Sequence, residues 1–404
     1  MVFSFFNKNA EDKTLVLLVD IGSASVGCAL VRRKEGGISQ VLATTRTELH
    51  FQESLSSAKF LLAMNHALER ALKAMQIKTR EISLDKGKAE IVSPAYIFCT
   101  LSSPWFILKN RHIQLVRDNP FEVNREMLDN LLDKDIELLK EEIKETLPLK
   151  DMVIIEKKII QMKLNGYEIK NPYGQKTSQM DIIVNVGISS GRVVQSIEQK
   201  ISQFFHSPLI HFGAFPVAAF SAIRDMFPSE KSFIFLDITG EATDVSFSAN
   251  DILMETTSFP YGKNFFIRKL STSLHTPHEE AGTLFSMFLR KELPPDQQIL
   301  VESTVAEAEK EWSSRFGKSI NMLSRNGVIP RKVFFTTDVD LTPFFSRLIT
   351  KEKTELLLNE SFEVQYINQP LVANFISFAP EVSRDSFLVI EALLVEKIIH
   401  SSQL

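Results

Sequence analysis

Leu15-Val16-Leu17-Leu18-Val19-Asp20-Ile21-Gly22-Ser23-Ala24-Ser25 has a counterpart in the second half of the chain, Phe233-Ile234-Phe235-Leu236-Asp237-Ile238-Thr239-Gly240-Glu241-Ala242-Thr243-Asp244. Each stretch is an apolar run that stops at an aspartate and turns through glycine and small residues into a further strand. Such a hairpin can present backbone N–H groups to phosphate while its aspartate holds a hydrated cation. One copy is a weak signal, because Asp-Gly turns between strands are common. Two copies, one in each half, predict a two-lobed phosphate clamp.

Length and composition limit the class of protein. At 404 residues the chain exceeds one ordinary hydrophobic core, so two or more domains are expected. The net charge of −4, without a dense Lys/Arg stripe, argues against nucleic-acid binding. Only two cysteines are present, which favours a reducing cytoplasm over a disulfide framework. The sequence contains no apolar run long enough to span a membrane and no signal peptide at its start, so no transmembrane segment is expected.

The order of predicted elements repeats. A β-meander at 14–48 leads into a helix with apolar residues at three- and four-residue spacing. After 230 the same order returns: strand, acidic loop, strands, then helices. The segment 104–189 looks like an insertion, with a helix at about 124–146 and two strands joined at Asn165-Gly166. Asn171-Pro172-Tyr173-Gly174 predicts another tight turn there, and 190–206 is again helical.

These motifs resemble the actin-like ATPase superfamily, most closely its FtsA/PilM branch. Residues 20–26 and 237–244 resemble the two phosphate loops, and Phe259-Pro260-Tyr261-Gly262 resembles the step into the following helix. The string at 165–174 resembles the small SHS2 subdomain of FtsA. The fold expected is therefore α/β, a duplicated ribonuclease-H-like actin fold with two lobes around a nucleotide cleft and a small α+β insertion. We expect a first lobe at 1–103 plus 190–230, the insertion at 104–189, and a second lobe at 231–404.

The resemblance also implies a site for ATP and Mg²⁺, in which Asp20 and Asp237 hold the metal through water. The implied nucleotide-binding residues are Asp20, Gly22, Ser23, Ala24, Ser25, Asp237, Gly240, Glu241, Ala242, Thr243, Gly262, Lys263, Thr337 and Asp338. No catalytic residue is implied.

Three departures weaken this site. Thr239 stands where the second phosphate loop usually has a glycine, and its Cβ narrows the room for phosphate. The adenosine loop, Phe334-Phe335-Thr336-Thr337-Asp338, lacks both expected glycines and adds a negative charge. Phe285 replaces an expected lysine. The chain is therefore expected to be at most a weak ATPase.

Other classes of site find less support. His275-Thr276-Pro277-His278 resembles a metal pair, but Pro277 favours a helix entry. A sugar or acetate kinase would need a substrate-side general base, and none is identifiable between Ser25 and Glu90. A purely structural pseudo-ATPase that binds no nucleotide remains an alternative.

The function expected from the resemblance is assembly and partner binding in bacterial cell division, with nucleotide as a structural ligand or switch. The alternative is a PilM-like role in type IV pilus assembly. Self-association and protein partners are expected, with the insertion as the candidate contact surface. The helix at Asp385–His400 has no basic stripe and is expected to belong to the core, so membrane contact is at most peripheral. Val2–Lys8 resembles the start of PilM-type proteins. The expected location is the cytoplasm, at the inner face of the membrane through partners.

Overall fold

Each acidic hairpin lies inside a mixed sheet of the computed structural model, which describes residues 15–34, 38–52, 56–85, 93–146, 151–206, 210–352 and 360–401. In the first sheet, β1 (Leu15–Ile21) pairs antiparallel with β2 (Ser25–Arg32) and parallel with β4 (Tyr96–Leu101). Every residue of β1 is buried, as a continuous apolar run in a sheet covered on both faces requires. The full order is β15-β3-β2-β1-β4-β9, with β3 at Gln40–Glu48, β9 at Ile210–Ala214 and β15 at Ser377–Phe378.

The second sheet repeats this plan. Its β10 (Phe233–Ile238) pairs antiparallel with β11 (Thr243–Ala249) and parallel with β13 (Lys332–Thr336). The remaining strands give the order β12-β11-β10-β13-β14, with β12 at Ile252–Phe259 and β14 at Glu363–Tyr366. Asp20 and Asp237 therefore occupy matching places, each beside a threonine of the parallel neighbour, Thr100 or Thr336.

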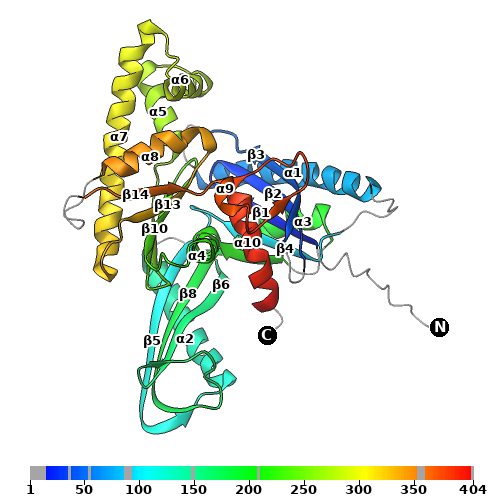
Figure 1. Ribbon diagram of the computed structural model, residues 1–404, viewed down its shortest axis with the longest axis vertical. Helices are drawn as coiled ribbons and strands as arrows, with labels where there is room; N and C mark the ends of the chain where they lie inside the picture. The colour runs from blue at the N-terminus through cyan, green and yellow to red at the C-terminus, as the bar shows by residue number, and fades with distance from the viewer. Residues whose placement is uncertain are drawn as a thin grey trace.

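Helices cover the sheets and complete two cores (Figure 1). On the first sheet, α1 (Ser57–Asp85) packs with α3 (Gly191–Phe204), and α4 (Phe215–Met226) packs with α10 (Ser386–Ser401). The second core contains buried Trp312 and many buried phenylalanines. Its helices are α5 (Lys263–Leu274), α6 (His278–Arg290), α7 (Pro295–Leu323) and α8 (Thr342–Lys351), and the short α9 spans Gln369–Val372.

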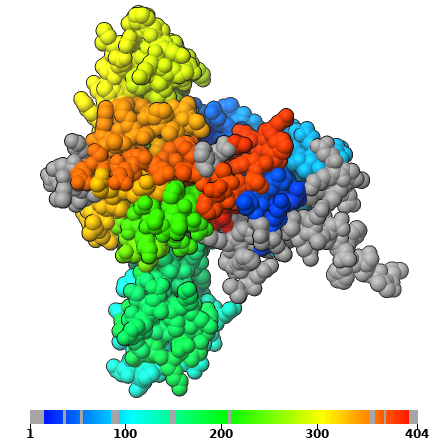
Figure 2. Space-filling model, in the orientation of Figure 1, coloured from blue at the N-terminus to red at the C-terminus, as the bar shows by residue number. Residues whose placement is uncertain are grey.

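The insertion forms a sheet of its own. Its four antiparallel strands have the order β5-β8-β6-β7, and α2 (Arg125–Thr146) packs on them through a separate core. The strands are β5 (Ile107–Glu122), β6 (Met152–Leu164), β7 (Tyr167–Glu168) and β8 (Lys176–Ser190). Asn165 and Gly166 have φ angles of 49° and 84°, so the predicted Asn-Gly turn joins β6 to β7. The insertion projects from the body at the end opposite α5, α6 and α7 (Figure 2).

The C-terminal segment departs from the expected division into 1–103 plus 190–230 and 231–404. β15 pairs with β3, and α10 packs against β1 and β2 of the first sheet. Phe387, Leu388, Val389 and Ile390 are buried in the first core, so α10 is a core helix as expected. The prediction for Val2–Lys8 lies outside the described residues. Among the helices that the structure describes, none is both long enough and apolar enough to cross a membrane.

Candidate functional site

A cavity of about 790 Å³ lies between the two sheets, at the ends of β1 and β10. Its volume is within the usual range of small-molecule sites, ~300–1,000 Å³. Residues of both lobes line this cavity. They include Asp20, Gly22, Ala24, Ser25, Arg46, Glu48, His50, Arg70, Ser102, Thr239, Gly240, Lys263, Asn264, Gly282, Ser286, Asp338 and Phe387.

Asp20 is bound to an arginine. Its side chain is 2% exposed, and Oδ2 lies 2.7 Å from Nη2 of Arg46, a residue of β3. Burial raises the pKa of Asp20, and the charge of Arg46 opposes that rise. Its second oxygen, Oδ1, is buried and has no hydrogen-bond partner in the described part of the chain. The carboxylate that was expected to hold a hydrated metal ion is thus paired with a guanidinium.

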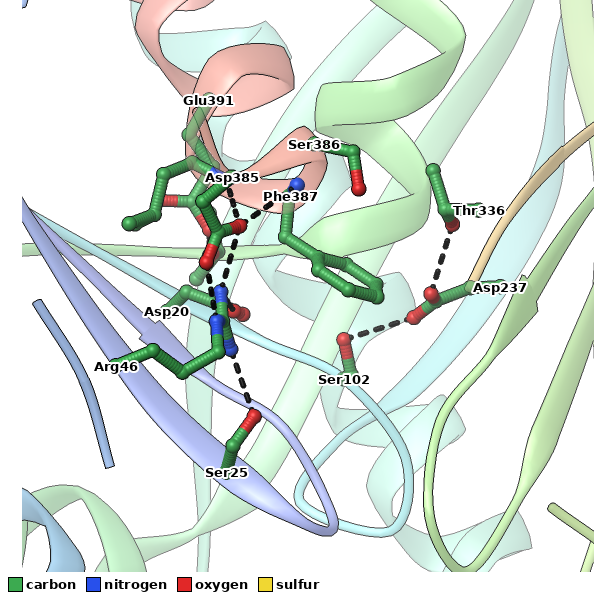
Figure 3. Close-up of polar contacts among 12 residues, drawn as sticks. Asp20, Ser25, Arg46, Ser102, Asp237, Thr336, Asp385, Ser386, Phe387 and Glu391 are labelled. Carbon is green, nitrogen blue, oxygen red and sulfur yellow. Dashed lines mark hydrogen bonds and ion pairs between the residues drawn. The ribbon is translucent and has the colours of Figure 1, made fainter. Parts of the chain in front are cut away.

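Arg46 is held from several sides (Figure 3). Its Nη1 donates to the Ser25 hydroxyl at 2.8 Å, and its Nε and Nη2 bind both oxygens of Asp385. Asp385 also caps α10, because its Oδ1 accepts the amides of Phe387 and Leu388 at 3.0 and 3.2 Å. The phosphate-loop strands and the C-terminal helix are therefore connected through one arginine side chain.

Asp237 is buried and engaged by hydroxyl groups. Ser102 donates to its Oδ2 at 3.0 Å, and Thr336 donates to its Oδ1 at 2.9 Å. Burial and the neighbouring Asp244 hold the pKa of Asp237 well above its usual range. Ser103 binds Asp244 through its hydroxyl and its amide, and burial raises the pKa of Asp244 to about 6. In the view of Figure 3, the Phe387 ring lies between the Arg46 group and the Asp237 group.

The two loops touch each other directly. The Ser23 hydroxyl accepts the Glu241 amide at 2.8 Å and lies 2.6 Å from the Thr239 hydroxyl. Because Thr239 donates to the Ala242 carbonyl at 3.0 Å, Ser23 is the donor to Thr239. Thr239, which departs from the family pattern, thus forms part of a hydrogen-bonded link between the lobes. A Cβ on Gly240 would overlap Ala24, so only glycine allows this approach.

The start of α5 is bound to the second loop. Lys263 and Asn264 donate their amides to the carbonyls of Thr239 and Gly240 at 3.0 and 2.8 Å. A Cβ on Gly262 would overlap the Thr239 carbonyl oxygen, which explains glycine at this step. Asn264 also donates to Glu241, whose carboxylate is paired with Arg268.

The residues expected to contact the adenosine, at 334–338 and in α6, are engaged in contacts with their own neighbours. Asp338 lies 3.2 Å from Nζ of Lys263, so the extra negative charge has its own counter-ion. Thr337 is buried and does not line the cavity. Phe285, in place of the expected lysine, is stacked on Phe266 in the second core with ring centroids 5.6 Å apart. Gly282 and Ser286 of α6 line the cavity instead.

The structure brings only part of the predicted set to the cavity wall. Asp20, Gly22, Ala24, Ser25, Gly240, Lys263 and Asp338 line it, whereas Ser23, Asp237, Glu241, Ala242, Thr243, Gly262 and Thr337 do not. Thr243 instead donates to the Tyr261 carbonyl at 2.8 Å. Sequence reasoning missed Arg46, Ser102, Asp385 and Phe387, and no motif around them indicated a role.

These residues do not fit Mg²⁺ held through water by two aspartates. One aspartate is paired with Arg46, and both oxygens of the other accept hydroxyl hydrogens. The one oxygen of the pair without a partner among the described residues, Oδ1 of Asp20, lies next to the Arg46 charge, which would repel a cation bound there. No group of three or more His, Cys, Asp or Glu side chains within the described ranges could hold a metal ion.

The chain resembles a solved structure along nearly its whole length. No family model matches the sequence, and the search of curated proteins gives no match. The PilM–PilN type IV pilus biogenesis complex contains a similar chain, with a TM-score of 0.62 and 13% identity over 96% of this chain and 99% of that chain. The ethanolamine utilization protein EutJ from Carboxydothermus hydrogenoformans gives a TM-score of 0.41 at 13% identity, over 93% of this chain and 88% of that one.

A protein of unknown function from Bacteroides thetaiotaomicron, described as having an actin-like ATPase fold, gives a TM-score of 0.39 at 9% identity, over 97% of this chain and 99% of that one. The PilM comparison leaves out only 4% of this chain, so it must include most of the insertion at 104–189. The duplicated sheets, the cleft and the likeness to the PilM chain lead to one conclusion: the chain has the actin-like ATPase fold.

Proposed function

We propose that this chain is a PilM-like component of type IV pilus assembly that acts by binding other proteins rather than by turning over ATP. The observation that carries the proposal is the likeness to PilM over 96% of this chain, since it includes the insertion as well as both lobes. The identity of 13% leaves the partner to be tested directly.

The state of the cleft supports a binding role over catalysis. Actin-like ATPases usually bind ATP with Mg²⁺. Here Asp20 is paired with Arg46, and both oxygens of Asp237 accept hydrogen bonds from hydroxyl groups. The Arg46 charge would repel a cation beside Asp20, so efficient hydrolysis with Mg²⁺ is not expected.

The neighbour was solved with PilN, so a PilN-type protein is the first partner to test. The far end of the inserted sheet offers a contact surface, because it exposes two large side chains, Tyr167 at 80% and Val116 at 64%. The register aligns Val116 with Gln179 of β8, and Tyr167, through Leu164, with Met180. The two side chains therefore lie at opposite edges and on opposite faces of this end of the sheet, so each face presents one exposed residue. We propose that the protein acts in the cytoplasm, where it self-associates and reaches the inner membrane face through partners.

The test is a binding titration of the purified chain with the PilN-type protein of the same organism. We expect a saturable complex that is weakened in the double variant Tyr167→Ser, Val116→Ser. Val328→Ser is a matched control, since Val328 is 88% exposed on the second lobe. No complex with the PilN-type protein, together with steady ATP hydrolysis at ordinary enzyme rates, would overturn the proposal. The role in cell division stays a prediction, which no observation on this chain favours.

A further inference from the structure

The position beside Asp20 is occupied by a positive charge that belongs to the chain itself. The Arg46 guanidinium contacts Asp20, Asp385 and Ser25, which come from β1, the N-cap of α10 and β2. A hydrated cation bound to Asp20 would therefore have to displace an arginine that four other oxygen or aromatic contacts keep in place.

The surrounding structure is built around this side chain. Arg46 pairs across β2 and β3 with Gly27, where a Cβ would lie only 2.6 Å from Nη2. The guanidinium carbon also lies 5.1 Å from the centroid of the Phe387 ring, a cation–π contact. Glycine on one side and an aromatic ring on the other leave a slot of the right shape for a planar guanidinium.

Arg46 also faces the cavity. Its side chain is 22% exposed and lines the 790 Å³ space with the basic side chains of Arg70 and Lys263. The acidic side chains of Asp20, Glu48 and Asp338 line it as well, and Asp338 is paired with Lys263. The planar guanidinium suits phosphate oxygens, and its positive charge does not depend on a bound metal. Ser23 and Thr239 already close the gap between the two loops. Phosphate groups therefore have to lie on the Arg46 side of the cavity rather than between the loops.

We propose that Arg46 takes the place of the divalent cation in this cleft, and that the cavity binds nucleoside di- and triphosphates as free anions. Arg46 is then the residue that determines metal independence. This inference does not require a PilN-type partner, so each can fail without the other.

The experiment is a calorimetric titration of the full chain with ATP and with ADP, first in EDTA and then with excess Mg²⁺. In the native protein we expect binding in EDTA, and equal or weaker binding with Mg²⁺, because the metal removes negative charge from the ligand. The Arg46→Met variant should lose on the order of tenfold or more in EDTA, the loss expected for hydrogen bonds to charged groups. With Asp20 freed, the same variant should gain affinity when Mg²⁺ is added.

Arg111→Met is the matched control. Arg111 likewise binds two carboxylates, Asp135 and Glu142, but it lies in the insertion. It should leave nucleotide binding unchanged in both buffers. If Arg46→Met does not fold, Arg46→Lys keeps a charge without the planar fork, and it should bind nucleotide more weakly in EDTA. Binding that needs Mg²⁺, binding unaffected by either Arg46 variant, or no nucleotide binding in EDTA would each overturn the proposal.

Discussion

Glu156 should make the stability of this protein fall as pH rises towards neutrality. This residue of β6 lies where the insertion meets the first lobe, and its Oε2 accepts the amide of Ala214 at 3.1 Å. Burial raises its pKa from an ordinary 4.5 to about 7, although the Ala214 amide and the charge of Lys158 oppose the rise. Between these two pKa values the folded chain holds a proton that the unfolded chain has released. Stability contributed by the neutral form is therefore complete below pH 4.5 and is lost as pH rises through 7.

The size of the effect follows from the shift. A difference of 2.5 pKa units corresponds to about 3.5 kcal/mol at most, at ~1.4 kcal/mol per unit. The value is an upper limit, because Glu156 keeps part of its surface exposed and water screens the charged form. Glutamine at 156 has the shape of the protonated acid and does not ionise. We expect Glu156→Gln to match the native protein at pH 4.5 and to exceed its stability by up to about 3.5 kcal/mol at pH 8.

The assay is urea unfolding of both proteins at several pH values between 4.5 and 8, with the difference in unfolding free energy plotted against pH. Taking the difference removes the contributions of the other buried acids, Asp20, Asp237, Asp244 and Glu391, which both proteins share. Glu122→Gln, at an exposed position of the same insertion, should give a flat line. A flat line for Glu156→Gln would refute the reasoning. So would a variant that is less stable at pH 8, since the charged form would then be the favoured one.

Three further predictions concern the cleft. Gly262→Ala should lower the unfolding free energy by about 2 kcal/mol or more, because its Cβ would overlap the Thr239 carbonyl. Gly282→Ala within α6, where a Cβ would make only an ordinary contact with Ile267, should raise it by roughly 0.5–1 kcal/mol; urea unfolding measures both. Ser23→Ala should cost about 1–3 kcal/mol in the same assay, because the buried Glu241 amide loses its acceptor, and an unchanged midpoint would contradict the link between the loops. Asp237→Asn should gain stability relative to the native protein as pH rises, because burial and Asp244 raise the pKa of Asp237 in the folded chain, and its ionisation then costs the native protein stability; a difference in melting temperature that stays constant or shrinks as pH rises would contradict this.

Local sequence signals were enough for the duplicated plan. The apolar runs before Asp20 and Asp237 predicted β1 and β10, and the Asn165-Gly166 turn correctly predicted a hairpin within the insertion. These features depend on residues close together in the chain. β9 and α4 were missed because their apolar residues follow one another without a clear period. β15 has only two residues and is defined by its pairing with β3, so local sequence gives no signal for it.

Local sequence signals could not predict which side chains pair with the two aspartates of the cleft. Asp20 and Asp237 were correctly placed at strand ends, but the sequence does not reveal what binds their carboxylates. Arg46 and Asp385 are 339 residues apart, and nothing near either residue signals the contact. Likewise, Glu391 accepts a hydrogen bond from the Thr100 hydroxyl inside the first core only because α10 packs against the first sheet. A motif identifies a loop, whereas the charge balance of a site depends on side chains that the fold brings together.

Hydrogen bonds between the lobes bear on how such a protein could work. Ser102 and Ser103 of the first lobe bind Asp237 and Asp244 of the second, and Asn110 of the insertion donates to the Leu253 carbonyl of β12. These hydrogen bonds join the two lobes directly. Opening the cleft would leave buried polar groups without partners, which is costly. A fixed relative position of the lobes keeps a binding surface that spans them preorganised, and preorganisation lowers the entropy cost of binding a partner. A protein that assembles with others gains from this rigidity, whereas an ATPase that cycles between open and closed states would have to break these bonds in each turnover.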